Sequence, residues 1–258
     1  MKRYVGAGVR KEGDNNFFID YTYNYPEDII DIEEPQLYSS IHDNHIYRFG
    51  YRFKDDVDSK SRTAFIHSVK QIGDHPLTDS QLDQFIKRPL AYLDDMINLY
   101  DIDCMVYPAS NRSPLVIKMI RAINDMTSHD MHKCSFELVK QAPTNISFDW
   151  GAFESEHVDD AGYRDSVRYI ENVLLPKLHD LDYFSIARDV KSKYRKYLTG
   201  FLKFADIADI EKFSRLQGAN ILVVDDINTT GSTLQEILRI LSKLNHECNI
   251  FVYTLIGK

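Results

Sequence analysis

The stretch "ANILVVDDINTTGSTLQEILRILSKL", residues 219–244, decides the fold that we expect. An apolar run leads into Asp225 and Asp226, then into a turn rich in Thr, Gly and Ser, and then into apolar residues at helical spacing. This order predicts a buried strand, a turn and a helix, as in a parallel α/β sheet. Ligands of such sheets bind beyond the carboxyl ends of the strands. The two carboxylates and the turn are therefore expected at a functional edge.

Similar alternation extends outward in both directions along the chain. An alternating strand with an aromatic face is expected at 45–53, and a helix that Pro89 kinks or divides at 78–100. Buried strands and helices are also predicted at 101–110, 114–125, 132–141, 165–181 and 248–258. We expect an α/β fold with a parallel-sheet core flanked by helices. An N-terminal β-containing extension, a possible hood, is assigned to residues 1–60, and the core to 61–258 with an insertion at about 142–190.

The turn after the paired acids has the composition of an anion site. Its backbone amides and the start of the helix that follows can surround a phosphate, and Gly231 lets the chain approach the oxygens closely. The side chains that can donate hydroxyl hydrogen bonds are Thr229, Thr230, Ser232 and Thr233. Acceptor carboxylates beside such a turn suit a diol next to a phosphate, such as ribose 5-phosphate. The alternative is a capped helix start with solvated aspartates.

The segment "ILVVDDINTTGST" resembles the signature of the type I phosphoribosyltransferases, which bind phosphoribosyl pyrophosphate (PRPP). Asn228 departs from the family, which usually has an apolar residue there. The segments "YRFGYRF", "FIHSVKQIGD", "IDCMVYPASNRSPL" and "KYRKYLTGF" are similar to the ComF-like branch. The zinc-binding cysteine cluster of many ComF-like relatives is absent from this sequence.

The resemblance implies a site for PRPP and Mg²⁺. Asp225 and Asp226 would hold the ribose hydroxyls and would meet Mg²⁺ through water, and residues 229–233 would bind the 5-phosphate. Pyrophosphate would lie against the loop formed by Ser110, Asn111 and Arg112. Lys191 and Arg195, in a basic segment of the acidic chain, would act with the two aspartates in catalysis as part of a closing loop; Lys70 and Lys140 are further cationic candidates. The alternatives are an exposed loop arginine at position 112 and a solvated charged face at 188–196.

The implied function is transfer of 5-phosphoribosyl from PRPP to an unidentified acceptor, a nitrogenous base by preference, with release of pyrophosphate. Two alternatives stay open: a non-catalytic PRPP or nucleotide sensor, and a ComF-like interaction protein in competence. The partners would be PRPP and a small-molecule acceptor, with a homodimer as an open possibility.

Composition sets limits on partners and location. The formal net charge of -8 disfavours duplex DNA as a partner. No apolar run predicts a membrane span or a signal peptide. The three separated cysteines indicate reduced thiols, so a cytoplasmic location is expected.

Overall fold

The computed structural model describes residues 9–12, 16–19, 30–32, 38–39, 45–72, 74–109, 113–126, 134–228 and 230–257. The chain forms two compact units. The first, called unit 1, comprises Met1–Glu137, Leu216–Thr229 and Glu247–Lys258. The second, unit 2, comprises Leu138–Arg215 and Thr230–His246.

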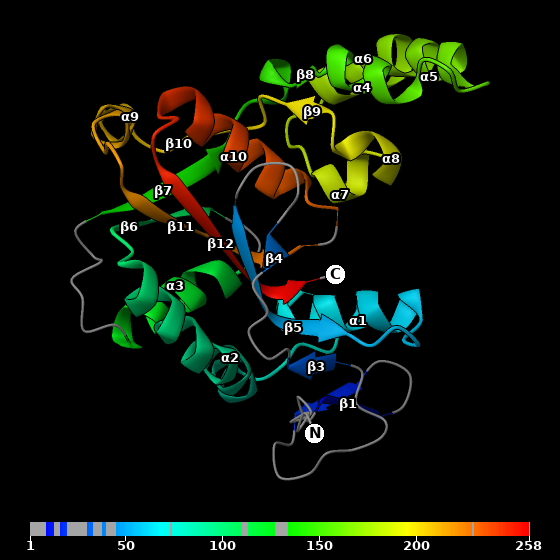
Figure 1. The fold of residues 1–258 in the computed structure, drawn as a ribbon. Coiled ribbons are helices and arrows are strands. Elements are labelled where there is room, and N and C mark those ends of the chain that lie inside the picture. Colours follow the sequence, from blue (N-terminus) through cyan, green and yellow to red (C-terminus); the bar gives the residue numbers. More distant parts are fainter. Residues whose placement is uncertain are drawn as a thin grey trace. The chain divides into compact units, whose positions relative to one another are not determined.

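Unit 1 is built on a mostly parallel sheet. Its strand order is β7-β6-β11-β12-β5-β3, and β4 also pairs with β5 (Figure 1). Strands β6, β11, β12 and β5 run parallel, while β3 and β4 are antiparallel to β5. The strands are β1 (Val9–Glu12), β2 (Asn16–Ile19), β3 (Ile30–Ile32), β4 (Tyr38–Ser39), β5 (Ile46–Phe53), β6 (Cys104–Pro108), β7 (Ser135–Lys140), β11 (Asn220–Ile227) and β12 (Asn249–Gly257). The expected α/β class with a β-containing N-terminal region is confirmed.

Three helices bury one face of this sheet. They are α1 (Ser59–Val69), α2 (Asp79–Tyr100) and α3 (Leu115–Met126). Leu222 and Val224 of β11 alternate onto the same face and belong to the hydrophobic core, together with Met119 of α3 and Leu93 of α2. Burying each such side chain contributes about 1.5–3 kcal/mol, so packing rather than helix propensity holds these elements together.

Pro89 lies inside α2, which runs as one helix from Asp79 to Tyr100, so Pro89 does not divide this helix. Proline has no N–H, so the carbonyl four residues earlier, that of Phe85, loses its helical donor. The Tyr51 hydroxyl of β5 donates to this carbonyl at 2.7 Å, and the Tyr51 and Phe85 rings stack 4.1 Å apart. A strand side chain therefore compensates for the proline.

We expect Tyr51→Phe to lower the free energy of unfolding by about 1–3 kcal/mol, since it leaves a buried carbonyl without a donor. In a Pro89→Ala background the restored N–H can bond to Phe85, so the same change should cost less. Urea denaturation of the four proteins of this double-mutant cycle measures the difference. An equal cost in both backgrounds would contradict the compensation.

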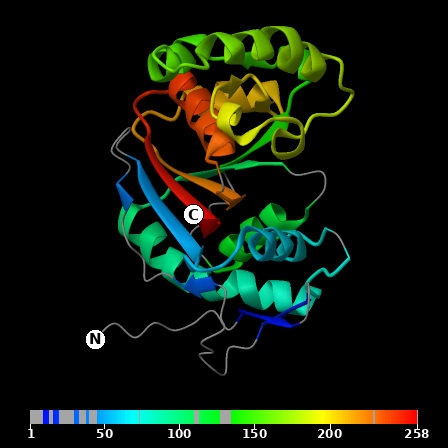
Figure 2. The ribbon, with the colours of Figure 1, turned by 90° about the vertical axis from the view of Figure 1, so that its right-hand side faces the viewer.

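Unit 2 holds short elements around a longer helix (Figure 2). The later half of β7 pairs antiparallel with β10, and β8 with β9. The helix predicted over 165–181 is confirmed as α5, the π-helical η3 and α6. The elements are η2 (Pro143–Asn145), β8 (Ser147–Phe148), α4 (Trp150–His157), α5 (Tyr163–Tyr169), η3 (Ile170–Leu174), α6 (Leu175–His179), α7 (Ile186–Asp189), α8 (Ser192–Arg195), β9 (Leu198–Thr199), β10 (Leu202–Phe204), α9 (Ile207–Ser214) and α10 (Ser232–Leu244).

The predicted division into residues 1–60 and 61–258 stays a prediction. The predicted insertion at 142–190 lies within unit 2. In the part of the chain that the structure describes, no helix has both the length and the apolar character that crossing a membrane requires.

Candidate functional site

The paired carboxylates lie near the carboxyl end of β11, which runs through both of them to Ile227. Asp225 and Asp226 are only 5% and 6% exposed. The Asp226 N–H donates to Asp225 Oδ1 at 2.9 Å, and Asp225 stands in register with Thr254 of β12. Burial, and after it the adjacent Asp226 charge, raise the pKa of Asp225 to about 7, and Lys70 opposes both. Any positive charge added near Asp225 would therefore stabilise its ionised carboxylate.

Lys70 supplies a cation to this pair. Its Nζ lies 2.7 Å from Asp226 Oδ2 and 3.0 Å from Oδ1, and its side chain is 26% exposed. Lys70 is the C-cap residue of α1 and precedes Asp226 by 156 positions in the chain. The sequence offered it only as one cation among several.

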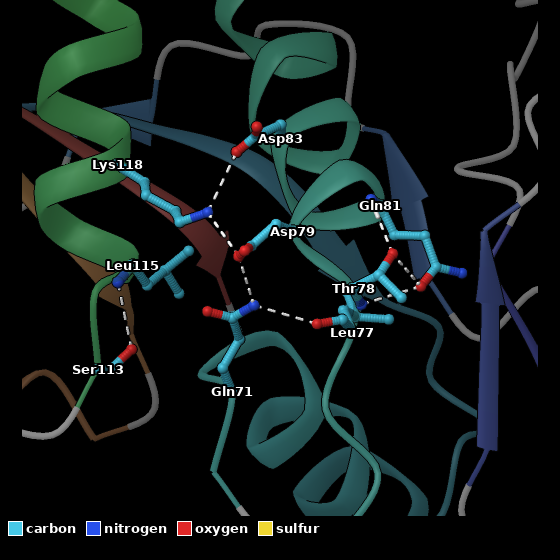
Figure 3. A network of polar contacts seen from close by, with 9 residues as sticks. All are labelled: Gln71, Leu77, Thr78, Asp79, Gln81, Asp83, Ser113, Leu115 and Lys118. Atoms are coloured by element: carbon cyan, nitrogen blue, oxygen red, sulfur yellow. Dashed lines mark hydrogen bonds and ion pairs between the residues drawn. The ribbon is translucent and has the colours of Figure 1, made fainter.

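A network of polar contacts holds the residues that follow Lys70 in the chain. Gln71 has a left-handed backbone (φ 55°), and its Nε2 donates to the Leu77 carbonyl at 3.1 Å and to Asp79 Oδ1 at 3.0 Å. Lys118 of α3 donates to the same Asp79 oxygen at 2.9 Å (Figure 3). Thr78, the N-cap residue of α2, and Gln81 form a capping box at the start of this helix. Figure 3 shows the capping box and the Asp79 contacts at the same helix end. These contacts hold Gln71, which follows α1, against the start of α2, and so position the neighbouring Lys70.

The predicted phosphate turn belongs to unit 2 from Thr230 onward. Gly231 adopts φ 74°, which favours glycine, and α10 begins at the next residue. Thr230 Oγ1 and Ser232 Oγ lie 2.9 Å apart, and Ser232 is buried. The first amides of a helix lack partners in the helix and carry partial positive charge. The local conformation therefore has the donors that an anion requires.

The structure describes only some of the other predicted site residues. Ser110, Asn111, Arg112 and Thr229 lie outside the described residues. Asn228 donates its N–H to the Ile256 carbonyl at 2.9 Å, a backbone contact that does not explain its side chain.

The two basic candidates make contacts inside unit 2. Arg195 donates from Nε to the Val190 carbonyl at 2.8 Å and from Nη2 to the Ala187 carbonyl at 2.6 Å, and burial lowers its pKa. Lys191 Nζ lies 4.3 Å from the centroid of the Tyr169 ring. In this conformation Arg195 bonds to the α7 segment and Lys191 lies against Tyr169 of α5, so a closing role would require these contacts to be exchanged.

The chemistry of Asp225 and Asp226 suits a magnesium ion. Carboxylate oxygens are ligands that Mg²⁺ prefers, and the ion keeps several waters. Among the described residues, no group of three or more His, Cys, Asp or Glu side chains could hold a metal. Two carboxylates would leave the other ligand positions of such an ion to water and ligand oxygens. The three cysteines are free, and burial raises the pKa of Cys104.

Comparison with known families gives a match for the C-terminal third of the chain. Residues 173–258 match the phosphoribosyl transferase domain, and the matched segment includes β11, α10 and β12. This C-terminal segment is similar to phosphoribosyl transferase domains. The resemblance inferred from the motif is confirmed at this level, while the ComF-like branch stays a prediction.

Solved structures give only distant likenesses to this chain. A hypothetical protein from Neisseria gonorrhoeae with bound ppGpp is 14% identical, with a TM-score of 0.36 over 70% of this chain and 69% of that one. A hypoxanthine phosphoribosyltransferase from Staphylococcus aureus is 12% identical, with a TM-score of 0.34 over 68% of this chain and 65%, less than two thirds, of its own. No curated protein matches the chain significantly.

Proposed function

We propose that this protein binds PRPP with Mg²⁺ and transfers its 5-phosphoribosyl group to a nitrogenous small molecule. The observation that carries the proposal is the buried Asp225–Asp226 pair at the end of β11, separated by only four residues from Gly231 and the first turn of α10. This segment lies inside the matched domain. Its two halves have the chemistry of a diol site and a phosphate site.

The carboxylate pair and the turn bind different parts of PRPP. The carboxylates of Asp225 and Asp226 accept hydrogen bonds from the ribose hydroxyls. The 5-phosphate is bound by the turn residues 229–233, where Gly231 and the α10 amides provide the closest approach. Bound Mg²⁺ would supply positive charge to the diphosphate. Ser110, Asn111 and Arg112 are proposed for the pyrophosphate, and Lys191 and Arg195 for the closing loop.

The proposed reaction is a substitution at ribose C1. The bond from C1 to the pyrophosphate oxygen breaks, the bond from C1 to the acceptor nitrogen forms, and the acceptor releases a proton. Catalysis would come from positioning and from stabilisation of charge. The free cysteines are compatible with the reducing cytoplasm predicted from the sequence.

Calorimetry with PRPP and Mg²⁺ tests the binding step. We expect the wild type to bind and Asp225→Asn/Asp226→Asn to lose at least about tenfold in affinity, as for charged hydrogen bonds. Asp55→Asn/Asp56→Asn is the matched control, because it changes the same two charges in an exposed turn. Absence of binding to the wild type, or equal binding by both double variants, would contradict the site.

Pyrophosphate release, screened over nitrogenous bases and amines, separates transfer from sensing. A transferase releases pyrophosphate with one class of acceptor and Mg²⁺. Binding of PRPP without release in the presence of any acceptor would identify the sensor.

A further inference from the structure

A cavity in unit 2 is lined by none of the residues assigned to PRPP. Its volume is about 180 Å³, and its lining residues belong to α4, the turn that follows it, α5 and α8. The lining residues are Phe153, His157, Asp160, Gly162, Tyr163, Ser166, Lys193 and Tyr194. None of them is required by the proposed transfer.

The walls are mainly aromatic, and their positions are fixed. The Phe153 ring lies 5.8 Å from that of Tyr163 and 4.9 Å from that of His157. His157 is held on both sides, since Nδ1 lies 2.7 Å from Asp160 Oδ2 and Nε2 lies 2.8 Å from the hydroxyl of Tyr197. Aromatic walls of this kind favour a flat ring that can stack or pack edge to face.

Polar side chains, one acidic and one basic among them, also line the cavity. The Asp160 side chain is 62% exposed and keeps acceptor capacity beside His157. Lys193 Nζ lies 4.6 Å from the Tyr194 ring centroid, and Lys193 can donate hydrogen bonds. Ser166 Oγ accepts from the Tyr194 hydroxyl at 3.2 Å, which leaves its own hydrogen to donate. A ligand would thus meet an acceptor and two donors around an apolar centre.

Size and charge then select the class of ligand. A cavity of about 150 Å³ holds benzene, while drug-sized ligands occupy about 300–1,000 Å³. The space here suits one small ring system rather than a nucleotide. One carboxylate and one ammonium give no preference for a net charge, so the lining does not select a polyanion such as PRPP.

We propose that this cavity binds a small uncharged aromatic heterocycle that carries both hydrogen-bond donors and acceptors, of the kind found in free nucleobases. The inference concerns binding and does not depend on phosphoribosyl transfer. It therefore stands or fails separately from the PRPP site.

Trp150, the chain's one tryptophan, is a built-in reporter, because its ring lies 6.3 Å from that of Phe153. Uracil, cytosine, adenine and nicotinamide are titrated against the full chain by Trp150 fluorescence and by ligand-detected NMR. Indole serves as an apolar ring probe, and ribose 5-phosphate as an anionic probe. We expect at least one heterocycle to bind at least about tenfold tighter than indole, since only the heterocycles can pair with the polar groups.

Two variants place the binding in the cavity. Ser166→Leu fills the space and should weaken binding at least about tenfold, whereas Asp160→Asn keeps the shape and should weaken it about threefold or more. Ser155→Leu on α4 is the matched control, because Ser155 is exposed and does not line the cavity. If Ser166→Leu fails to fold by circular dichroism, Asp160→Asn and Lys193→Met carry the test.

Four outcomes would overturn the proposal: no heterocycle binds, indole binds as tightly as the heterocycles, ribose 5-phosphate competes for the site, or the folded cavity variants bind like the wild type. Loss of PRPP binding in Asp225→Asn/Asp226→Asn with heterocycle binding unchanged would leave the two sites as separate findings.

Discussion

Asp225→Asn is expected to raise the free energy of unfolding at pH 8 by a few kcal/mol, up to about 4 kcal/mol from a pKa that moves from 3.8 to about 7. The carboxylate is charged at this pH and lies in a buried strand beside a second carboxylate. The amide removes the charge and keeps an oxygen for the Asp226 N–H, which now donates to Asp225 Oδ1. Most substitutions of buried residues destabilise, so the sign itself is distinctive.

The gain depends on pH in a defined direction. Below the unfolded-state pKa of 3.8 the carboxyl group is protonated in both states, and its burial costs no charge. Between 3.8 and about 7 the folded state binds more protons, so the stability that Asp225 contributes is lost as the pH rises. The difference between variant and wild type should therefore be small at pH 4 and should grow until about pH 7.

Urea denaturation and hydrogen exchange of the β11 amides measure this difference from pH 4 to pH 8. Asp55→Asn is the control and should change stability by less than about 0.5 kcal/mol, because Asp55 is exposed. Lys70→Met should act in the opposite direction to Asp225→Asn, since Lys70 is the cation that lowers the pKa of Asp225. A difference that does not vary with pH would mean that the Asp225 carboxylate is solvated.

The stability of Asp225→Asn also bears on the calorimetric test of PRPP binding. A site that keeps two buried carboxylates at a cost in stability has the character of a functional site. If Asp225→Asn is more stable than the wild type and yet loses PRPP affinity, unfolding cannot explain the loss. The stability data and the calorimetry then support the same role by independent routes.

Local patterns in the sequence were sufficient for the elements that form the sheet. The strands β6, β11 and β12 are buried on both faces, so each is a nearly continuous apolar run, and α3 and α10 repeat apolar residues at helical spacing. The turn at Gly231 could be predicted because it needs glycine for its positive φ. These features lie within short stretches of chain.

Contacts between distant residues could not be predicted in the same way. No local pattern links Lys70 to Asp226 or Tyr51 to the carbonyl exposed by Pro89, because the partners are 156 and 34 residues apart. The helices α7 and α8 span four residues each, too few to show a helical period. The cavity is likewise formed by residues from separate short elements, so no local pattern indicated it.

Glu236→Ala is expected to destabilise unit 2 by about 3–5 kcal/mol, the cost of breaking a buried ion pair. The Glu236 side chain is fully buried on α10. It accepts two hydrogen bonds of 2.7 Å from Arg239 and one of 2.8 Å from the Gly200 N–H. Gly200 adopts φ 75°, and a Cβ there would collide with the Asn145 carbonyl oxygen, so the chain after β9 has little freedom to find another acceptor.

The measurement is urea unfolding followed by Trp150 fluorescence, which reports on unit 2. Glu211→Ala on α9 is the matched control: it removes a Glu from a pair with Arg215 at 3.7 Å, but both side chains are at least 70% exposed. Such a pair contributes about 0.3–0.5 kcal/mol. Arg239→Met should be as costly as Glu236→Ala, because it leaves the buried Glu236 carboxylate without its counter-charge. Equal small losses in all three variants would show that Glu236 is hydrated in solution and does not anchor the Gly200 turn.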